Sequence, residues 1–399
     1  MNRVEVLLYA KKARVLNENS HRKGYTMTKR LLIAGLLILL LAVALLAVAC
    51  GEEEPAATTA GPATTAGPAT TAGPATTAAP TTDTTVAQKP IELSMASMSA
   101  PEAPIGLALE AWAEEIKQAS NGLLTIRHYG SSQLVKGPEM RSGVRDGVAD
   151  IGHSFIFGAE PGFEVAVNLT QLVRGKDTLD GIRIFEAIWA KYTELMESQW
   201  KDFKLLWIFP THSSALFTTE KAVRTMADIK GLEIRVPNAI LADFMKNLGA
   251  SPISMSTPDW ITSLDKGTTD GGATTVGSMY DFQIADNFKY CTNFAMGCSV
   301  NWLAMNMETW NSLSPELQKI IDDSLPSARQ KAIDAWVESE KLTRQFSLDA
   351  GIEFIDLPDD EYARWNEAVM PVYDKMAADM DALGFPGTEL VEYALGLAR

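Results

Sequence analysis

Residues 90–399 are predicted to adopt an α/β fold built mainly on parallel sheets. Short apolar runs typical of buried strands alternate along the chain with longer amphipathic runs typical of helices, the order expected of helices covering a parallel sheet. Several helical runs open with a proline in the first turn, often after Ser or Thr. Hydrophobic residues make up 46% and charged residues 21% of 399, which suits two domains or one two-lobed body.

The strands and helices are predicted in order from Pro90. Period-two alternation predicts a first strand at 91–95, and Pro104 opens a helix that Asn121-Gly122 ends. Further strands are expected at 124–129, from Gly147 to Ile151, at 204–209 and at 232–236. Further helices are expected around Met140 and Val144, from Thr257 as the capping residue, from Ser314 with a kink at Pro326, and over the last forty residues.

The charge is unevenly distributed. The chain carries −15 overall, but residues 1–49 contain eight Lys or Arg and two Asp or Glu, which leaves −21 on the remainder. So acidic a body argues against a nucleic-acid partner, because binding to phosphates needs clustered basic side chains. A single buried arginine could still bind an anion in its own pocket.

The N-terminal segment 1–49 is predicted to direct export. Residues 31–49 are uncharged and apolar and follow Lys29 and Arg30, so the basic end would stay in the cytoplasm. Small residues lead up to Cys50, which resembles the lipidation motif of bacterial lipoproteins. The alternative is an uncleaved membrane anchor. Both tether the chain outside the membrane, and Met27 is the more natural start of a signal peptide.

Residues 50–89 are predicted to be a disordered spacer after the lipidated cysteine. The hexad Ala-Thr-Thr-Ala-Gly-Pro recurs there, with almost nothing apolar to bury. Such a spacer would hold a folded body near the membrane.

Three segments of the body resemble the solute-binding proteins of TRAP transporters, the DctP-like family. The first is Asp228-Ile-Lys-Gly-Leu-Glu-Ile-Arg-Val-Pro237. The second combines 248–252 with Leu-Asp-Lys-Gly-Thr-Thr-Asp-Gly at 264–271, and the third combines Gln133-Leu134 with 144–150. They occur in the family's order, and the similarity covers roughly 90–399.

The resemblance implies a two-lobed, periplasmic-binding-protein-like fold with mixed or parallel sheets, a hinge and a long linking helix. Lobe I would comprise 90–212 plus 301–340, and lobe II 213–300 plus 341–399. It implies a receptor that closes on a small organic acid and delivers it to TRAP membrane permease subunits, with no cofactor and no metal.

Arg235 is the principal candidate for ligand binding. The resemblance places it at the end of a cleft strand, and a guanidinium offers a planar pair of donors that matches a carboxylate. The alternative is a structural arginine paired with a nearby aspartate.

The other candidates are weaker. The resemblance places His153 and Phe155 in a loop beside the cleft, and Asn301 and Trp302 where the chain returns to lobe I; ordinary core packing is the alternative for them. Thr274 lies where relatives often place Asn or Gln. Asp150 and Asp270 fit turns or caps better than ligand contacts.

Two departures from the family pattern narrow the ligand class. Many relatives carry a second arginine about twenty residues before the first, but 214–219 contains none, and 272–275 reads Gly-Ala-Thr-Thr. We infer a less polar pocket, suited to a monocarboxylate with an apolar or aromatic part. Cys291 and Cys298 would form a disulfide or remain as buried thiols.

Competing functions are a receptor for an ATP-driven importer or a sensor, and an extracytoplasmic enzyme. The sequence contains four histidines, and no HExxH, GxSxG, Walker loop or CxxC pair. We therefore predict a binding protein and not an enzyme.

Overall fold

The computed structural model describes residues 89–156 and 162–398. The predicted signal peptide with its start at Met27, the lipidation site Cys50 and the spacer up to residue 88 lie outside the described residues. Among the described helices, none has the length and apolar character needed to cross a membrane.

Strands and helices alternate through most of the described body, as predicted. The strands are β1 (Ile91–Ser97), β2 (Leu124–Tyr129), β3 (Ile151–Phe155), β4 (Phe203–Thr218), β5 (Glu233–Val236), β6 (Ser251–Ser254), β7 (Gly271–Thr275), β8 (Tyr290–Asn293), β9 (Cys298–Asn306) and β10 (Glu353–Asp356). The longer helices are α2 (Pro104–Ala119), α4 (Glu164–Leu172), α5 (Thr178–Lys191), α8 (Ala239–Asn247), α9 (Thr257–Asp265), α12 (Pro315–Asp349), α13 (Asp359–Ala382) and α14 (Gly387–Leu397). Shorter ones are α3 (Met140–Arg145), α6 (Thr193–Ser198), α7 (Met226–Ile229), α10 (Gly277–Asp281) and α11 (Met307–Ser312).

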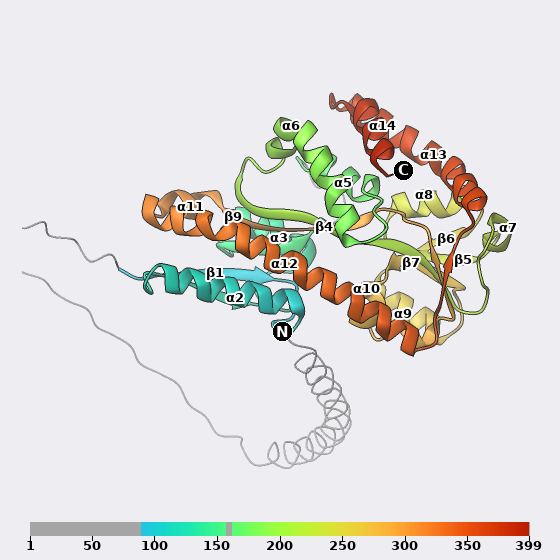
Figure 1. Cartoon of the computed structure of the whole chain (residues 1–399), viewed down its shortest axis with the longest axis horizontal. Helices are drawn as coiled ribbons and strands as arrows, with labels where there is room; N and C mark the ends of the chain where they lie inside the picture. The colour runs from blue at the N-terminus through green and yellow to red at the C-terminus, as the bar shows by residue number, and fades with distance from the viewer. Residues whose placement is uncertain (1–88, 157–161, 399) are drawn as a thin grey trace, which may run out of the picture. The chain divides into compact units, whose positions relative to one another are not determined.

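One mixed sheet runs through the body in the order β2-β1-β3-β9-β4-β7-β5-β6, with β8 and β10 attached beside β4. Strand β4 connects its two halves (Figure 1). Phe203 to Ser213 pair antiparallel with β9, whereas Ser214 to Thr218 pair with β7 and β8. Parallel pairs occur in both halves, beside the antiparallel pairs that β4 and β9 make, so the sheet is mixed.

Helix α12 is the long helix of the fold. It packs against α2 at one end and against α10 at the other (Figure 1). Because α2 lies on β2 and α10 contacts β7, the helix is connected to both halves of the sheet. The Ser314 side chain caps its first turn by accepting from the Leu317 N–H. The helix continues through Pro326, where we predicted a kink. Apolar side chains of α2, α12 and the first half of the sheet form one core, which includes Trp112, Trp207 and Leu303.

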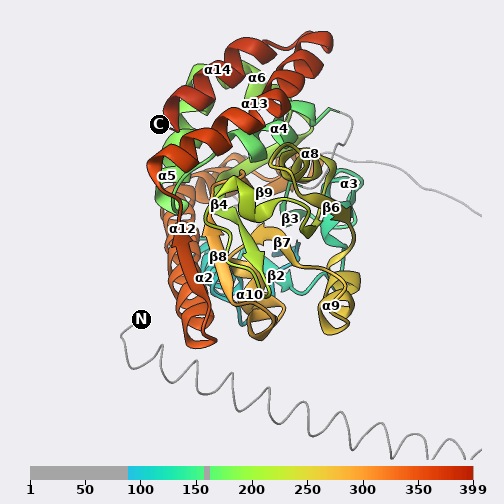
Figure 2. The same ribbon diagram turned by 90° about the vertical axis from the view of Figure 1, so that its right-hand side faces the viewer.

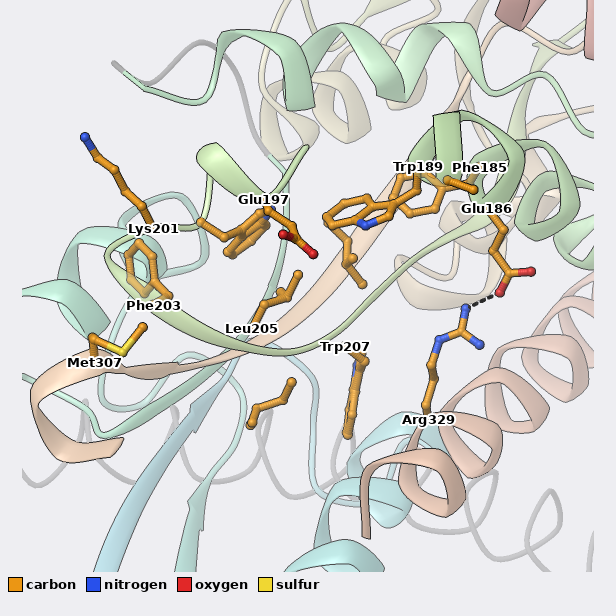
Figure 3. A pocket seen from close by; sticks show the side chains of 14 residues that line it. Phe185, Glu186, Trp189, Glu197, Lys201, Phe203, Leu205, Trp207, Met307 and Arg329 are labelled. Carbon is orange, nitrogen blue, oxygen red and sulfur yellow. Dashed lines mark hydrogen bonds and ion pairs between the residues drawn. The ribbon is translucent and has the colours of Figure 1, made fainter. Parts of the chain in front are cut away.

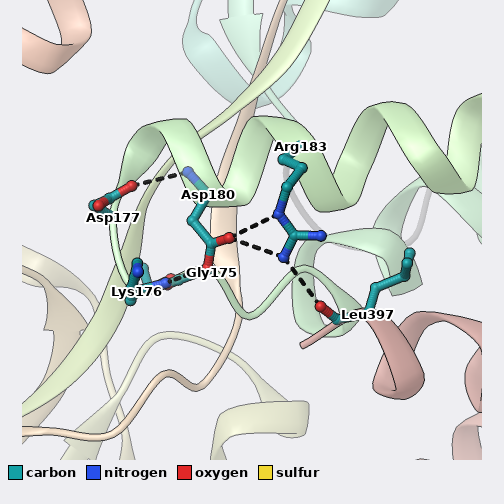
Figure 4. A network of polar contacts seen from close by, with 7 residues as sticks. Gly175, Lys176, Asp177, Asp180, Arg183 and Leu397 are labelled. Carbon is teal, nitrogen blue, oxygen red and sulfur yellow. Dashed lines mark hydrogen bonds and ion pairs between the residues drawn. The ribbon is translucent and has the colours of Figure 1, made fainter. Parts of the chain in front are cut away.

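The C-terminal helices α13 and α14 pack together (Figure 2). Helix α13 contacts α4 and α8, and α14 contacts α4 and α5. Arg183 of α5 holds the end of α14, because its Nη2 donates to the carbonyl of Leu397 at 3.1 Å and to Asp180 at 2.8 Å. Asp177 in turn caps α5 by accepting from the Asp180 N–H (Figure 4).

Two local predictions need correction. The residue that caps α9 is Ser256, whose hydroxyl accepts from the Asp259 N–H, and not Thr257, which lies in the first turn. Strand β3 begins at Ile151 and not at Gly147, because Gly147 adopts a φ of 73° in the turn that precedes the strand.

Candidate functional site

Arg235 is buried in β5, with 4% of its surface exposed. Its Nε donates to the carbonyl of Met255 at 3.1 Å, and its Nη2 donates to the hydroxyl of Thr257 at 3.3 Å. The guanidinium carbon lies 4.9 Å from the centroid of the Trp260 ring. The side chain is therefore held by neutral groups at the start of α9.

Within residues 89–156 and 162–398, no carboxylate lies at ion-pair distance from Arg235, which disfavours the structural pairing considered for it. Burial lowers the pKa of its guanidinium to about 10, so the group remains a cation at neutral pH. A buried cation without a counter-ion is costly, and an anionic ligand would offset this cost.

Thr274 lies in β7, which runs parallel to β5, with Gly272 opposite Arg235. Its hydroxyl is 2.7 Å from that of Ser278 in α10. Gly272 has a packing role: a Cβ there would lie 2.3 Å from the Trp260 ring. The glycine thus allows the indole to reach the guanidinium.

His153, Phe155 and Asn301 lie on one face of the paired strands β3 and β9. His153 and Phe155 therefore belong to a strand and not to the loop expected for them, because their backbone pairs with β9. Phe155 is directly opposite Asn301, and His153 is two residues earlier on β3. Both His153 and Asn301 are fully buried. Asn301 donates from Nδ2 to the carbonyl of Phe209 at 2.8 Å, and His153 Nδ1 is 3.2 Å from the hydroxyl of Ser97.

The imidazole of His153 is neutral. Burial, with a smaller effect from His128, lowers its pKa to about 3, and the nearby Asn301 side chain only partly opposes the shift. Even so, His153 Nε2 and Asn301 Oδ1 do not meet hydrogen-bond geometry with any described group.

Trp302 occupies a different environment from Asn301. Successive side chains on a strand point to opposite faces, so the Trp302 ring lies on the face of the sheet opposite to the Asn301 side chain. There it is 2% exposed and packs 5.4 Å from the ring centroid of Trp200. Its indole N–H donates to the carbonyl of Phe155 at 3.1 Å. The structure favours the core role weighed for this tryptophan, and we do not carry it forward as a ligand contact.

Two residues beside this site were not among the ligand candidates from the sequence, although His212 is one of the histidines that the enzyme alternative would need. His212 lies on β4, where its Nε2 accepts from the backbone N–H of Gly277 at 3.1 Å. Trp336 lies on α12, and its ring centroid is 6.2 Å from that of His212 and 5.6 Å from that of Phe155. Trp336 read as an ordinary apolar position of an amphipathic helix, and no local pattern distinguished it.

The candidates therefore form two groups on the two halves of the sheet. Arg235 and Thr274 lie in the half that contains β5 and β7, and His153, Phe155 and Asn301 lie in the half that contains β3 and β9. His212 connects them through β4 and its bond to Gly277, three residues after Thr274.

A pocket of about 600 Å³ lies elsewhere, along the first half of β4. Its lining is largely apolar and includes Trp189, Trp200 and Trp207, and an ion pair of 2.7 Å joins Arg329 to Glu186 at its side (Figure 3). None of the predicted ligand residues lines it. Trp207 contributes its ring but no accessible donor, since its indole nitrogen is fully buried.

The aspartates and cysteines have structural environments. Asp150 accepts from the backbone N–H and the hydroxyl of Ser94, and Asp270 accepts from the Glu233 N–H at 2.8 Å. Cys291 and Cys298 are free, buried thiols, the second of the two alternatives considered. Burial raises the pKa of both thiols.

Comparison with known proteins bears on this arrangement. Residues 95–379 match the family model of bacterial extracellular solute-binding protein, family 7. The chain is 23% identical over 285 residues to a solute-binding protein of Chromohalobacter salexigens, covering 70% of this chain and 82% of that one. It is 23% identical over 300 residues to the C4-dicarboxylate-binding periplasmic protein DctP of Rhodobacter capsulatus, covering 74% and 89%.

Solved structures are similar over the same body. A marine metagenome TRAP solute-binding protein specific for aromatic acid ligands, in complex with metahydroxyphenylacetate, is 25% identical with a TM-score of 0.68, covering 77% of this chain and 98% of that one. A TRAP solute-binding protein of Rhodoferax ferrireducens, in complex with benzoate, is 23% identical with a TM-score of 0.64, covering 77% and 97%. These likenesses confirm the predicted two-lobed, periplasmic-binding-protein-like α/β fold.

Proposed function

The chain belongs to the bacterial extracellular solute-binding proteins of family 7, and on this premise we propose that Arg235 holds the carboxylate of its ligand. The protein is a receptor of the TRAP type: it binds a small organic acid between two lobes and delivers it to a TRAP membrane permease. Its family is one of binding proteins, and we propose no catalytic role.

The observation that carries the assignment is the environment of Arg235. The guanidinium is buried, is positioned by a carbonyl, a hydroxyl and an indole ring, and has no carboxylate partner among the described residues. A ligand carboxylate would supply the missing charge and accept two parallel hydrogen bonds. Because the site is largely removed from water, this pairing would be stronger than on an open surface.

We propose that the ligand is a monocarboxylate with an aromatic or apolar part. No second arginine occurs at 214–219, and Phe155 and Trp336 place aromatic rings beside the buried polar residues of β3 and β9. The relatives of known structure that bind metahydroxyphenylacetate and benzoate are consistent with this class. A measured preference for a dicarboxylate or a sugar acid would contradict it.

The lobes would be 90–212 plus 301–340 and 213–300 plus 341–399. Strand β4 changes its partners from β9 to β7 and β8 between Ser213 and Ser214, which supports a boundary there. The contacts of α14 with α4 and α5 show that the C-terminal segment also reaches elements of the first lobe. Ligand contacts from both lobes would favour the closed arrangement, because only that arrangement makes all of them.

We also propose that the protein is exported to the periplasm or cell surface after cleavage of 1–49, and is held at the membrane by lipid on Cys50. The family's extracellular location supports export. Mass spectrometry of the mature N-terminus tests the anchor: a diacylated Cys50 supports it, and an intact segment 31–49 contradicts it.

Isothermal titration calorimetry on the full chain in mild detergent tests the binding function, with benzoate, 3-hydroxybenzoate, succinate and glucuronate as ligands. We expect saturable binding of an aromatic acid and a loss of about 30-fold or more in affinity in Arg235→Ala, since removing a buried charge partner typically costs 2–5 kcal/mol. Arg127→Ala, at an exposed position of β2, is the matched control. Unchanged affinity in Arg235→Ala would move the carboxylate site elsewhere.

A further inference from the structure

Four buried polar atoms without a hydrogen-bond partner gather around the junction of β3, β9, β4 and α12. They are His153 Nε2, Asn301 Oδ1, His212 Nδ1 and Trp336 Nε1, each unpaired with any described group. Phe155 links them, because it lies opposite Asn301 and against Trp336. Most buried polar groups in folded proteins are paired, so such a concentration calls for a partner supplied from outside the fold.

The four atoms are not equivalent. His153 and Asn301 are close neighbours on adjacent strands, and the Asn301 side chain acts on the ionisation of His153. A small side-chain adjustment would let these two groups pair with each other. No described residue is found in hydrogen-bond geometry with His212 Nδ1 or Trp336 Nε1.

The hydrogen-bonding roles of His212 and Trp336 follow from their contacts. Nε2 of His212 accepts the backbone N–H of Gly277, so in the neutral ring the proton lies on Nδ1. The indole nitrogen of Trp336 is always a donor. Two N–H groups therefore come from rings 6.2 Å apart at their centroids, and neither has an acceptor in the part of the chain that the structure describes.

We propose that His212 and Trp336 are specificity residues that donate hydrogen bonds to an uncharged oxygen substituent, such as a hydroxyl or oxo group, on the bound acid. This inference rests on the proposed function, in which Arg235 holds the carboxylate. The ring of the ligand would lie near Phe155, and insertion of the oxygen would be coupled to the movement of the lobes, because both donors are fully buried here.

The charges around this pair favour a neutral oxygen over a second carboxylate. The imidazole of His212 is itself uncharged, since burial lowers its pKa to about 4. Asp281 lies on the same short helix as Gly277, and its Oδ2 is 3.7 Å from where a Cβ on Gly277 would be. The Asp281 carboxylate would repel a second anionic group, whereas a hydroxyl carries no such penalty.

Calorimetry on the full chain with benzoate, the three hydroxybenzoates and isophthalate tests the inference. We expect one hydroxybenzoate to bind about 10-fold more tightly than benzoate, and isophthalate to bind more weakly than that hydroxybenzoate. In Trp336→Phe, which keeps an aromatic ring and loses the donor, this preference should fall to about 2-fold; because the preference is the ratio of two affinities of the same variant, any general change in affinity cancels. His212→Phe should lower the preference as well; it also removes the acceptor of the Gly277 N–H, so its folding is checked by urea denaturation alongside.

Two controls accompany these variants. His212→Gln keeps a donor and an acceptor of similar reach and should retain part of the preference, and Trp189→Phe, on α5, should retain all of it. Equal affinity of the wild-type chain for benzoate and every hydroxybenzoate would overturn the inference. So would a hydroxyl preference that persists in both Trp336→Phe and His212→Phe.

The two levels of the proposal fail in different ways. If the acids bind and Arg235 is required, but His212 and Trp336 do not affect the preference, only the specificity assignment is wrong. If no carboxylate binds the wild-type chain, the proposed function itself is overturned, and this inference with it.

Discussion

The guanidinium of Arg235 and the indole of Trp260 lie 4.9 Å apart, measured from the guanidinium carbon to the ring centroid. Gly272, directly opposite Arg235 on β7, leaves the space that this ring occupies. The position of the Arg235 guanidinium therefore depends on Gly272 in β7 and on Trp260 in α9. An aromatic face also attracts the cation without neutralising it, so the charge remains available to an anion.

Replacing Gly272 by alanine should disturb this arrangement. The new Cβ would lie 2.3 Å from the Trp260 ring, so the indole must shift. We expect a loss of stability of about 1–3 kcal/mol, as for other overpacked cores, together with weaker ligand binding. Urea denaturation and calorimetry measure the two effects. Gly396→Ala is the control, because nothing lies within 4 Å of its Cβ position, and it should leave both unchanged or add slight helix stability.

Ser256 and Thr257 are adjacent hydroxyl residues with separate roles. Ser256 caps α9, so Ser256→Ala should lower stability by about 1 kcal/mol with little effect on affinity. Thr257 instead accepts from Arg235, so Thr257→Val should weaken ligand binding by about 2- to 10-fold with a smaller effect on stability. Equal effects of the two variants on affinity would show that the Thr257 hydroxyl does not position the guanidinium.

Local patterns in the sequence predicted most of the elements, and the exceptions have a physical cause. The strand expected at 204–209 continues to Thr218. The prediction ended too early because the continuation contains polar residues such as His212 and Ser214, which are buried where β4 passes between the two halves of the sheet. From local sequence, a polar segment is predicted to be a loop, because the strands that bury it, here β7, β8 and β9, are far away in sequence. The capping role of Ser256 was assigned to its neighbour, because either hydroxyl fits the local pattern.

The candidate site was only partly accessible from the sequence. Arg235 stands within a motif that resembles a known family, so it could be named in advance. Trp260, His212 and Trp336 could not, because their significance comes from contacts across 25, 65 and more than 100 residues of chain. Trp302 shows the converse: it follows Asn301 directly in β9, so the alternation of side chains along a strand places the two on opposite faces, and only one of them can face the site.

The buried histidines predict how stability depends on pH. In the folded state burial lowers the pKa of His153 to about 3 and of His212 to about 4, whereas an unfolded histidine titrates near 6.5. Below pH 6.5 the unfolded chain therefore binds more protons, and the folded state loses stability until the pH falls below the folded pKa values. The full contribution is present only above about pH 6.5.

The variant His212→Gln isolates one part of this dependence. At pH 5 the lowered pKa of His212 corresponds to a loss of roughly 2 kcal/mol relative to pH 8, at about 1.4 kcal/mol for each pKa unit. Urea denaturation at pH 8, 6.5 and 5 should show a smaller fall for the variant, since glutamine does not titrate. Identical pH profiles for the two proteins would mean that His212 is accessible to protons in the folded state.

Asp150 provides a test that separates structural from ligand-binding residues within the family-like segments. Its half-buried carboxylate accepts from Ser94 N–H at 2.8 Å and Ser94 Oγ at 2.7 Å, and from Thr309 Oγ1 at 3.0 Å, and so joins β1, the start of β3 and α11. Asp150→Ala leaves these donors without a charged acceptor, and we expect a loss of about 2–3 kcal/mol in unfolding free energy. Ligand affinity measured on the folded fraction should stay within about 2-fold, because hydrogen bonds at the β1–β3 edge do not reach Arg235. Arg235→Ala should show the opposite pattern, with affinity lost and stability retained or increased, since a buried cation without a counter-ion is removed. A large loss of affinity in Asp150→Ala at full folding would instead place this aspartate at the ligand.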